Sequence, residues 1–89
     1  MTSSVSPQFR KLFGELPYET QDRARVKFAL WQENPQHPSL RFKKVSSKEP
    51  LWSARISRSY RVLGLREGDH IEWFWIGLHD EYERIIAQF

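Results

Sequence analysis

The sequence predicts an α+β fold in which an N-terminal helical hairpin packs on an antiparallel sheet of three to four strands, with a short C-terminal helix. Apolar residues recur at helical spacing in the first third of the chain and alternate at strand spacing through most of the remainder. Clusters of Pro, Gly and Ser separate these periodic segments, as turns do. Helices and strands that are segregated along a chain are typical of α+β folds.

Two helices are predicted at the N-terminal end. Ser6 is a suitable N-cap, and Pro7 stands at the first helical position, where a missing N–H does no harm. Pro17 separates this helix from the next, which stops at Asn34-Pro35 because a residue before proline disfavours helical geometry. The apolar stripes of the two helices are Phe9, Leu12, Phe13 and Leu16, and then Ala24, Phe28 and Trp31 with Leu30 beside them.

The rest of the chain predicts a meander of strands. The segment "LWSARIS" places Trp52, Ala54 and Ile56 on one face and Ser53, Arg55 and Ser57 on the other, since strand side chains alternate. The apolar residues of "HIEWFWIG" fall on both faces, which favours a central strand covered on both sides. The predicted strands cover residues 40–45, 51–57, 60–65 and 70–77, and a final helix covers residues 80–89.

Length and composition narrow the class of protein. The 89 residues suffice for one domain, residues 1–89, and cannot fill a second hydrophobic core. The chain has no cysteine, and His37, His70 and His79 are scattered, so we expect no disulfide, metal or cofactor. No apolar run could span a bilayer and no secretory signal is evident, so we expect a cytoplasmic protein without membrane contact.

Basic side chains concentrate in the middle of the chain. Between residues 41 and 66 only Glu49 opposes them. Such a segment indicates a polyanionic partner, either nucleic acid or an acidic protein segment, although a solvated basic face is the simpler alternative. The basic residues are Arg41, Lys43, Lys44, Lys48, Arg55, Arg58, Arg61 and Arg66.

Arg55 and Arg61 flank a predicted turn, so a hairpin can bring them together across adjacent strands. Whether they share a face depends on the turn length. Paired guanidinium groups repel each other unless an anion lies between them, and a phosphodiester matches their forked donors. The alternative is that one of them pairs with Glu72 or Asp69.

His79 follows the last predicted strand, and an imidazole can transfer protons near neutral pH, although a helix cap or a surface position is the plainer interpretation. The Tyr82 hydroxyl could orient a leaving oxygen or its ring could stack on a base, but core packing is the competing role. Lys43 and Lys44 could hold a nucleic-acid backbone or protect a strand edge from aggregation.

The chain contains no phosphate-binding glycine loop, no Ser–His nucleophile setting and no evident pair of catalytic carboxylates. Cleavage of RNA by its own 2′-hydroxyl needs none of these. A protein then has only to align the nucleophile, stabilise negative charge on phosphorus and protonate the leaving 5′-oxygen.

Two long segments, "FRKLFGELPYETQDRARVKFALWQENPQHPSLRFKKV" and "LWSARISRSYRVLGLREGDHIEWFWIGLHDEYERII", resemble the RelE/ParE superfamily of small toxins from bacterial type II toxin–antitoxin systems. The helical hairpin hinged at "LP", the "LRFKK" strand, the "ARISRSYRVL" hairpin and the closing "IGLHDEY" carry the resemblance. It implies a microbial-RNase-like fold with a cleft on the concave sheet face. Members usually begin with a β-strand, which the short "MTSSV" would leave shortened or lost.

The resemblance to RelE-like members implies a metal-independent endoribonuclease that cuts messenger RNA on the ribosome and is neutralised by a cognate antitoxin. ParE-type members share the scaffold and inhibit DNA gyrase, so a gyrase inhibitor or a non-catalytic binding module stays open, as does a homo-oligomer. The implied catalytic residues are Arg61, Arg55, His79 and Tyr82, and the implied RNA-binding residues are Lys43, Lys44, Arg41 and Arg58.

Overall fold

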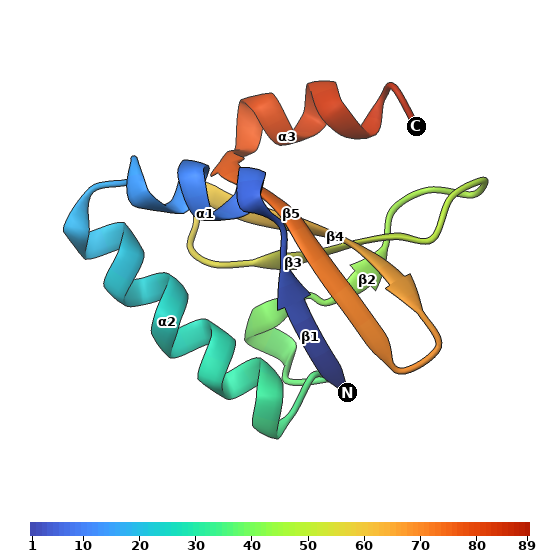
Figure 1. Cartoon of the computed structure of the whole chain (residues 1–89), viewed down its shortest axis with the longest axis horizontal. Coiled ribbons are helices and arrows are strands. Elements are labelled where there is room, and N and C mark those ends of the chain that lie inside the picture. Colours follow the sequence, from blue (N-terminus) through green and yellow to red (C-terminus); the bar gives the residue numbers. More distant parts are fainter.

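In the computed structural model, which describes residues 1–89, five strands form one mixed sheet in the order β1-β5-β4-β3-β2 (Figure 1). β1 runs parallel to β5, and the other neighbouring strands are antiparallel. The elements are β1 (Thr2–Val5), α1 (Pro7–Gly14), α2 (Tyr18–Glu33), the 3-10 helix η1 (Pro38–Leu40), β2 (Lys43–Lys44), β3 (Leu51–Arg55), β4 (Tyr60–Glu67), β5 (His70–Leu78) and α3 (His79–Ile86).

The predicted α+β architecture is confirmed, with a sheet that is wider than expected. The edge strand that we expected to be shortened or lost is present as β1, with four residues. The His70 ring bridges it to β5, because Nδ1 lies 2.8 Å from Thr2 Oγ1 and Nε2 lies 3.0 Å from Ser4 Oγ. Polar side chains therefore help to hold a strand whose residues carry little hydrophobic signal.

The helical hairpin forms as predicted. Ser6 Oγ accepts a hydrogen bond from the Phe9 N–H at 3.1 Å, which caps α1. α2 ends at Glu33, just before the Asn34-Pro35 pair. The buried Gln21 side chain donates to the Leu16 carbonyl at 3.0 Å and so ties the start of α2 to the connection between the helices.

The strand predicted over residues 40–45 is wrong in its extent, because only Lys43–Lys44 pair with β3. Leu40 ends the 3-10 helix, and Arg41 follows with a φ of +46°. That left-handed conformation is uncommon for a residue with a Cβ and interrupts an extended chain. Phe42 is nevertheless buried, so the apolar pattern indicated burial correctly and strand pairing incorrectly.

A β-bulge at Phe74 interrupts the regular alternation of side chains along β5. Leu63 pairs with Trp75, yet the next residue, Gly64, pairs with Trp73, so Phe74 has no residue opposite it. Trp73 consequently packs in the cluster beneath α1 and α2, whereas Trp75 packs with Tyr82 of α3. The prediction of a central strand covered on both sides is confirmed.

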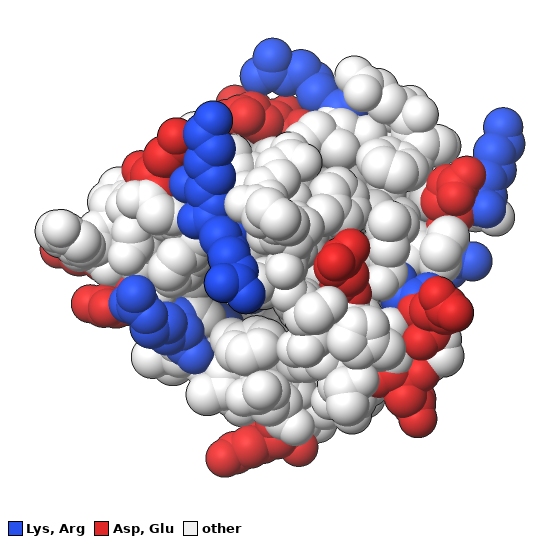
Figure 2. All heavy atoms as spheres, in the orientation of Figure 1, with Lys and Arg blue, Asp and Glu red and all other residues white.

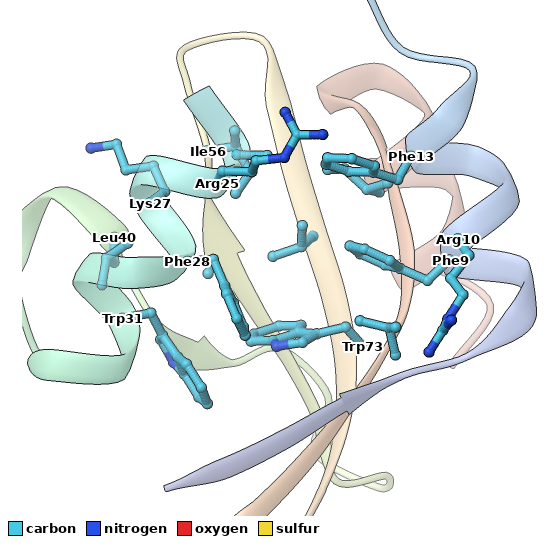
Figure 3. A pocket seen from close by; sticks show the side chains of 15 residues that line it. Phe9, Arg10, Phe13, Arg25, Lys27, Phe28, Trp31, Leu40, Ile56 and Trp73 are labelled. Carbon is cyan, nitrogen blue, oxygen red and sulfur yellow. The ribbon is translucent and has the colours of Figure 1, made fainter. Parts of the chain in front are cut away.

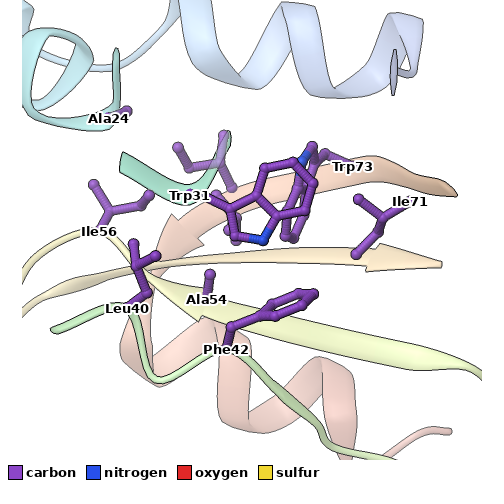
Figure 4. Packing of buried hydrophobic residues seen from close by; sticks show 10 residues of the cluster. Ala24, Trp31, Leu40, Phe42, Ala54, Ile56, Ile71 and Trp73 are labelled. Atoms are coloured by element: carbon purple, nitrogen blue, oxygen red, sulfur yellow. The ribbon is translucent and has the colours of Figure 1, made fainter. Parts of the chain in front are cut away.

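The larger core lies between α2 and the sheet (Figure 4). Trp31 is 2% exposed and meets Trp73 and Phe42 edge-on, with ring centroids 5.5 Å and 5.7 Å apart. Edge-to-face pairs of this kind add stability beyond the area they bury. Trp73 and Trp75 are both buried, whereas Trp52 is only half-buried.

An apolar groove of about 370 Å³ separates the helical hairpin from the sheet (Figure 3). Phe9 and Phe13 of α1 and Phe28 of α2 line it, and Arg25 reaches across to lie 5.2 Å from the centre of the Phe13 ring. Arg25 is also paired with Asp22 at 3.0 Å. The middle of the view in Figure 2 is largely uncharged, apart from a basic side chain that crosses it from the upper left and an acidic side chain to its right.

Candidate functional site

A second hollow, of about 420 Å³, lies on the opposite face of the sheet beside α3. We call it the cationic hollow, because its lining contains five Lys or Arg side chains and a single carboxylate. It draws side chains from β2, β3, β4, α3 and the residue after η1. The lining residues are Arg41, Lys43, Lys44, Val45, Ser53, Arg55, Arg61, His79, Tyr82, Glu83 and Ile86.

The register of the β3–β4 hairpin places both central arginines in this hollow. Arg55 lies directly opposite Arg61, so the two side chains leave the same face of the sheet. Neither forms an ion pair, and Asp69 lies 4.0 Å from Arg66 instead. The alternative in which one of the pair is neutralised by Glu72 or Asp69 is therefore wrong.

The Arg61 guanidinium is held by the turn that precedes it. Its Nη1 lies 2.7 Å from the carbonyl oxygen of Ser57 and 3.0 Å from that of Tyr60. The carbonyl oxygen of Arg58 is 3.2 Å away. The half-buried side chain is thus fixed by backbone acceptors that cannot rearrange without moving the turn.

Burial lowers the pKa of Arg61 below its ordinary value, and the like charge of Arg55 lowers it further. Arg41 acts in the same direction, whereas Tyr82 and Glu83 oppose the shift. A guanidinium keeps its proton at neutral pH even so. The hollow therefore presents confined positive charge with little internal compensation.

His79 is the first residue of α3, and its backbone N–H donates to the Ser59 carbonyl at 2.8 Å. Its Nε2 lies 3.3 Å from Glu83 Oε1, one helical turn away, and its ring centre is 5.6 Å from that of Tyr82. The side chain is 41% exposed, so solvent or a ligand can reach the imidazole. His79 thus joins the arginines in one hollow, which the sequence could not establish.

Tyr82 forms part of the wall of the hollow. The residue is 6% exposed, and its ring packs with Leu51, Leu63 and Trp75. Its hydroxyl lies 3.2 Å from Ser53 Oγ, which is also buried. This burial favours the packing role for the ring over stacking on a base.

The structure separates Arg58 from the other candidate residues. Its side chain is exposed at the tip of the hairpin and does not line the hollow, to which the residue contributes only its carbonyl contact with Arg61. Lys43 and Lys44 both line the hollow and are exposed. The remaining candidates that line it are Arg41, Arg55, Arg61, His79 and Tyr82.

Sequence reasoning missed Glu83 and Ser53 as members of the site. Glu83 follows His79 by four residues, and side chains at that spacing meet on a helix, which is the signal that could have found it. No three His, Cys, Asp or Glu side chains come together as a metal site. None of the helices combines the length and the apolar character that crossing a bilayer requires.

Several solved structures share this fold. YafQ from Escherichia coli strain BL21(DE3) aligns with a TM-score of 0.71 and 13% identity over 90% of this chain and 94% of that chain. A chain of the RelB–RelE antitoxin–toxin complex from Methanococcus jannaschii gives 0.72 and 16%, over 92% and 96%. The YoeB/ParE toxin from Agrobacterium tumefaciens gives 0.69 and 12%, over 89% and 99%. At such identities the likeness shows the fold.

The fold is that of toxins from type II toxin–antitoxin systems. The ParE-like toxin domain profile matches residues 19–84, and the chain belongs to this family within the RelE/ParE superfamily. The resemblance identified from the sequence is therefore confirmed. A search of curated protein sequences returns no match.

Proposed function

We propose that this toxin is an endoribonuclease that cleaves messenger RNA on the ribosome without a metal, with the RNA 2′-hydroxyl as the nucleophile. One observation carries the proposal: Arg55, Arg61 and His79 line the same hollow, with the exposed Lys43 and Lys44 beside them. Cations together with one proton-transfer group are what such a reaction requires.

In this mechanism the scissile phosphate lies against Arg55 and Arg61. Like charges directly opposite each other destabilise a sheet, so the two guanidinium groups gain most when an anion neutralises them. The extra negative charge that develops on phosphorus during attack strengthens that gain in the transition state. Donors arranged in advance of the reaction lower the barrier because they need no reorganisation.

His79 supplies the proton transfer, with Glu83 as its neighbour. The two side chains are 3.3 Å apart and therefore act as one unit on one side of the phosphate. In-line attack requires the nucleophile and the leaving oxygen to lie on opposite sides of phosphorus. We assign the pair to the leaving 5′-oxygen: the 2′-oxygen bonds to phosphorus to give a 2′,3′-cyclic phosphate, the bond to the 5′-oxygen breaks, His79 protonates that oxygen, and the 2′-hydroxyl proton passes to water.

The remaining cations hold the substrate backbone. Lys43, Lys44 and Arg41 are exposed, so they can contact phosphates on either side of the cleavage point. Contacts of this kind give affinity that falls with salt and carry little sequence information. Any codon preference would then come from elsewhere, such as the ribosome or the shape of the hollow.

We further propose that a cognate antitoxin neutralises the protein with an acidic segment placed over the cationic hollow. A surface with five cations and one carboxylate favours such a segment electrostatically. One of the structures with this fold is an antitoxin–toxin complex. A segment bound there would exclude RNA by occupying the same charges.

Inhibition of DNA gyrase is the second candidate function, because the family profile that matches carries the ParE-like name. A purely protein-binding toxin would use the scaffold without needing a proton-transfer group. The position of His79 beside the paired arginines therefore favours the nuclease.

The test is induced expression of the wild-type toxin, of Arg61→Gln and of Arg66→Gln, followed by mapping of message ends. Arg66 is a matched control, because it lies on the same strand but over the Trp52 ring, outside the hollow. We expect fragments from the wild type and Arg66→Gln, and cleavage lower by about 10²- to 10³-fold for Arg61→Gln. Intact messages with stalled DNA replication would replace the nuclease with the gyrase inhibitor.

A further inference from the structure

The turn between β3 and β4 directs its carbonyl groups at the site. The carbonyls of Ser57, Arg58 and Tyr60 accept hydrogen bonds from Nη1 of Arg61. The carbonyl of Ser59 accepts the backbone N–H of His79 at 2.8 Å. Every carbonyl from residue 57 to residue 60 therefore contacts either Arg61 or His79.

This arrangement decides which edge of Arg61 is free. A guanidinium has five N–H donors, and both hydrogens of Nη1 are engaged by the turn. Nε and Nη2 have no protein acceptor, although Arg61 lines the hollow. Two parallel N–H groups on one edge form a fork that matches two oxygens of a phosphate.

The same turn fixes where α3 begins. The N–H of a first helical residue has no partner within its own helix, and here the Ser59 carbonyl accepts it. The same short backbone segment thus contacts the backbone of His79 and the guanidinium of Arg61. A shift of the turn would move both groups together.

We propose that the Ser57–Tyr60 turn is the positioning element of the hollow, and that its carbonyls hold the free Nε–Nη2 edge of Arg61 and the His79 imidazole in register for one phosphate. The inference rests on the proposed function for its effect on cleavage. Its structural part, the anchoring of Arg61 by the turn, can be tested without any activity.

The turn at the other end of β4 provides a matched control. Its carbonyls at Gly68 and Asp69 accept from Arg66 Nε at 2.9 Å and from the Thr2 N–H at 2.9 Å, outside the hollow. We would insert Gly-Gly between Arg58 and Ser59 in one variant and between Gly68 and Asp69 in the other. The entropic cost of closing a flexible loop grows slowly with its length, and thermal melting of both variants sets a temperature at which each is folded.

We expect the insertion after Arg58 to lower kcat by about 10²-fold with little change in KM, since small misplacements of a catalytic group have effects of that size. The insertion after Gly68 should leave kcat near the wild-type value at a temperature where both variants are folded. An equal loss of kcat in the two variants would overturn the proposal.

Lysine substitutions test the edge of Arg61 directly. The ammonium of Arg61→Lys keeps the charge but has no second nitrogen, so it cannot contact the turn carbonyls and also present a fork to phosphate. We expect cleavage to fall by about 10²- to 10³-fold, as for removal of an oxyanion donor. Arg55→Lys, which has no such carbonyl partners, should retain much more activity, and near-wild-type cleavage by Arg61→Lys would contradict the inference.

An activity-independent measurement separates this inference from the proposed function. In ¹⁵N NMR spectra of the free toxin, the anchored Nη1 hydrogens of Arg61 should give resolved signals, while those of Arg55 average by rotation. The insertion after Arg58 should abolish the difference. Averaged Arg61 signals in the wild type overturn the anchoring even if RNA is cleaved, and resolved signals support it even if no RNA is cleaved.

Discussion

The two faces of the sheet are built from the same strands and have opposite characters. On the face beneath α1 and α2, Ala54 and Ile56 join a core around Trp31. On the face beside α3, Ser53 and Arg55 from the same strand segment line the cationic hollow. Both faces contain a space of similar size, about 370 Å³ and about 420 Å³, yet one is lined by aromatic rings and the other by charges.

The difference shows how a small chain separates stability from activity. α2 spans 16 residues and places Trp31 over one face, whereas α3 has 8 residues and covers only part of the other. The uncovered part holds two directly opposed guanidinium groups that cost stability in the free protein. Burial on the first face offsets that cost, so substitutions on the two faces should have separable effects.

The largest expected effect on stability is that of Trp31→Ala. It removes the ring that meets Trp73 and Phe42, and we expect the free energy of unfolding to fall by about 3–5 kcal/mol. Phe28→Ala is the control, because Phe28 stacks on Trp31 but is 38% exposed. Urea denaturation of both variants measures the difference, and an equal loss would break the contrast between a packed core and a groove rim.

Gly77→Ala and Gly64→Ala compare the two faces through substitutions whose expected effect on stability is intermediate. A Cβ on Gly77 would lie 2.5 Å from Cζ2 of Trp75, and one on Gly64 would lie 2.8 Å from Cε3 of Trp73. We expect each change to reduce the free energy of unfolding by about 1–3 kcal/mol through overpacking. Thermal melting provides the measurement.

Only Gly77→Ala should also lower kcat, because Gly77 lies opposite Arg61 in the sheet. Kinetics below both melting transitions would test this point. A matching decline in kcat for Gly64→Ala would show that the faces are not independent.

The smallest expected effect has the opposite sign. Arg55→Gln removes the charge opposite Arg61, so we expect the free energy of unfolding to rise by about 0.2–1 kcal/mol, most clearly at low salt. Arg66→Gln should reduce it instead, because Arg66 lies 4.5 Å from the Trp52 ring centre and donates to Gly68. Melting at low and high salt distinguishes the two, and destabilisation by Arg55→Gln would argue against repulsion.

Local chemistry made much of this fold predictable. The Ser6 cap, the stop at Asn34-Pro35 and the alternation of "LWSARIS" each depend on nearby residues, and each is present in the structure. This alternation is enough to predict that Arg55 and Ile56 lie on opposite faces of the sheet. That Arg55 and Arg61 share a face could not be predicted, because it depends on the register of the hairpin and hence on a turn geometry that the sequence leaves open.

The features that escaped prediction depend on contacts between distant residues. β1 is held to β5 partly by Thr2 and Ser4 on either side of His70, a pairing without hydrophobic periodicity. The strand predicted at residues 40–45 is interrupted by a backbone turn at Arg41 that no local residue type demands. The spacing of Glu83 from His79 predicts their contact, but the place of Glu83 in the hollow depends on how α3 folds back over the sheet.

The unpaired Phe74 has a consequence for how this strand can change its length. If the strand alternated regularly through residue 74, Trp75 would lie on the same face as Trp73, and each later residue of β5 would exchange faces. Deletion of Phe74 itself would restore regular alternation and keep the pairs Gly64–Trp73 and Leu63–Trp75, whereas a one-residue change elsewhere in β5 would shift one part of the strand to the other face. Viable variants of this toxin should therefore change the length of β5 by a single residue only at position 74.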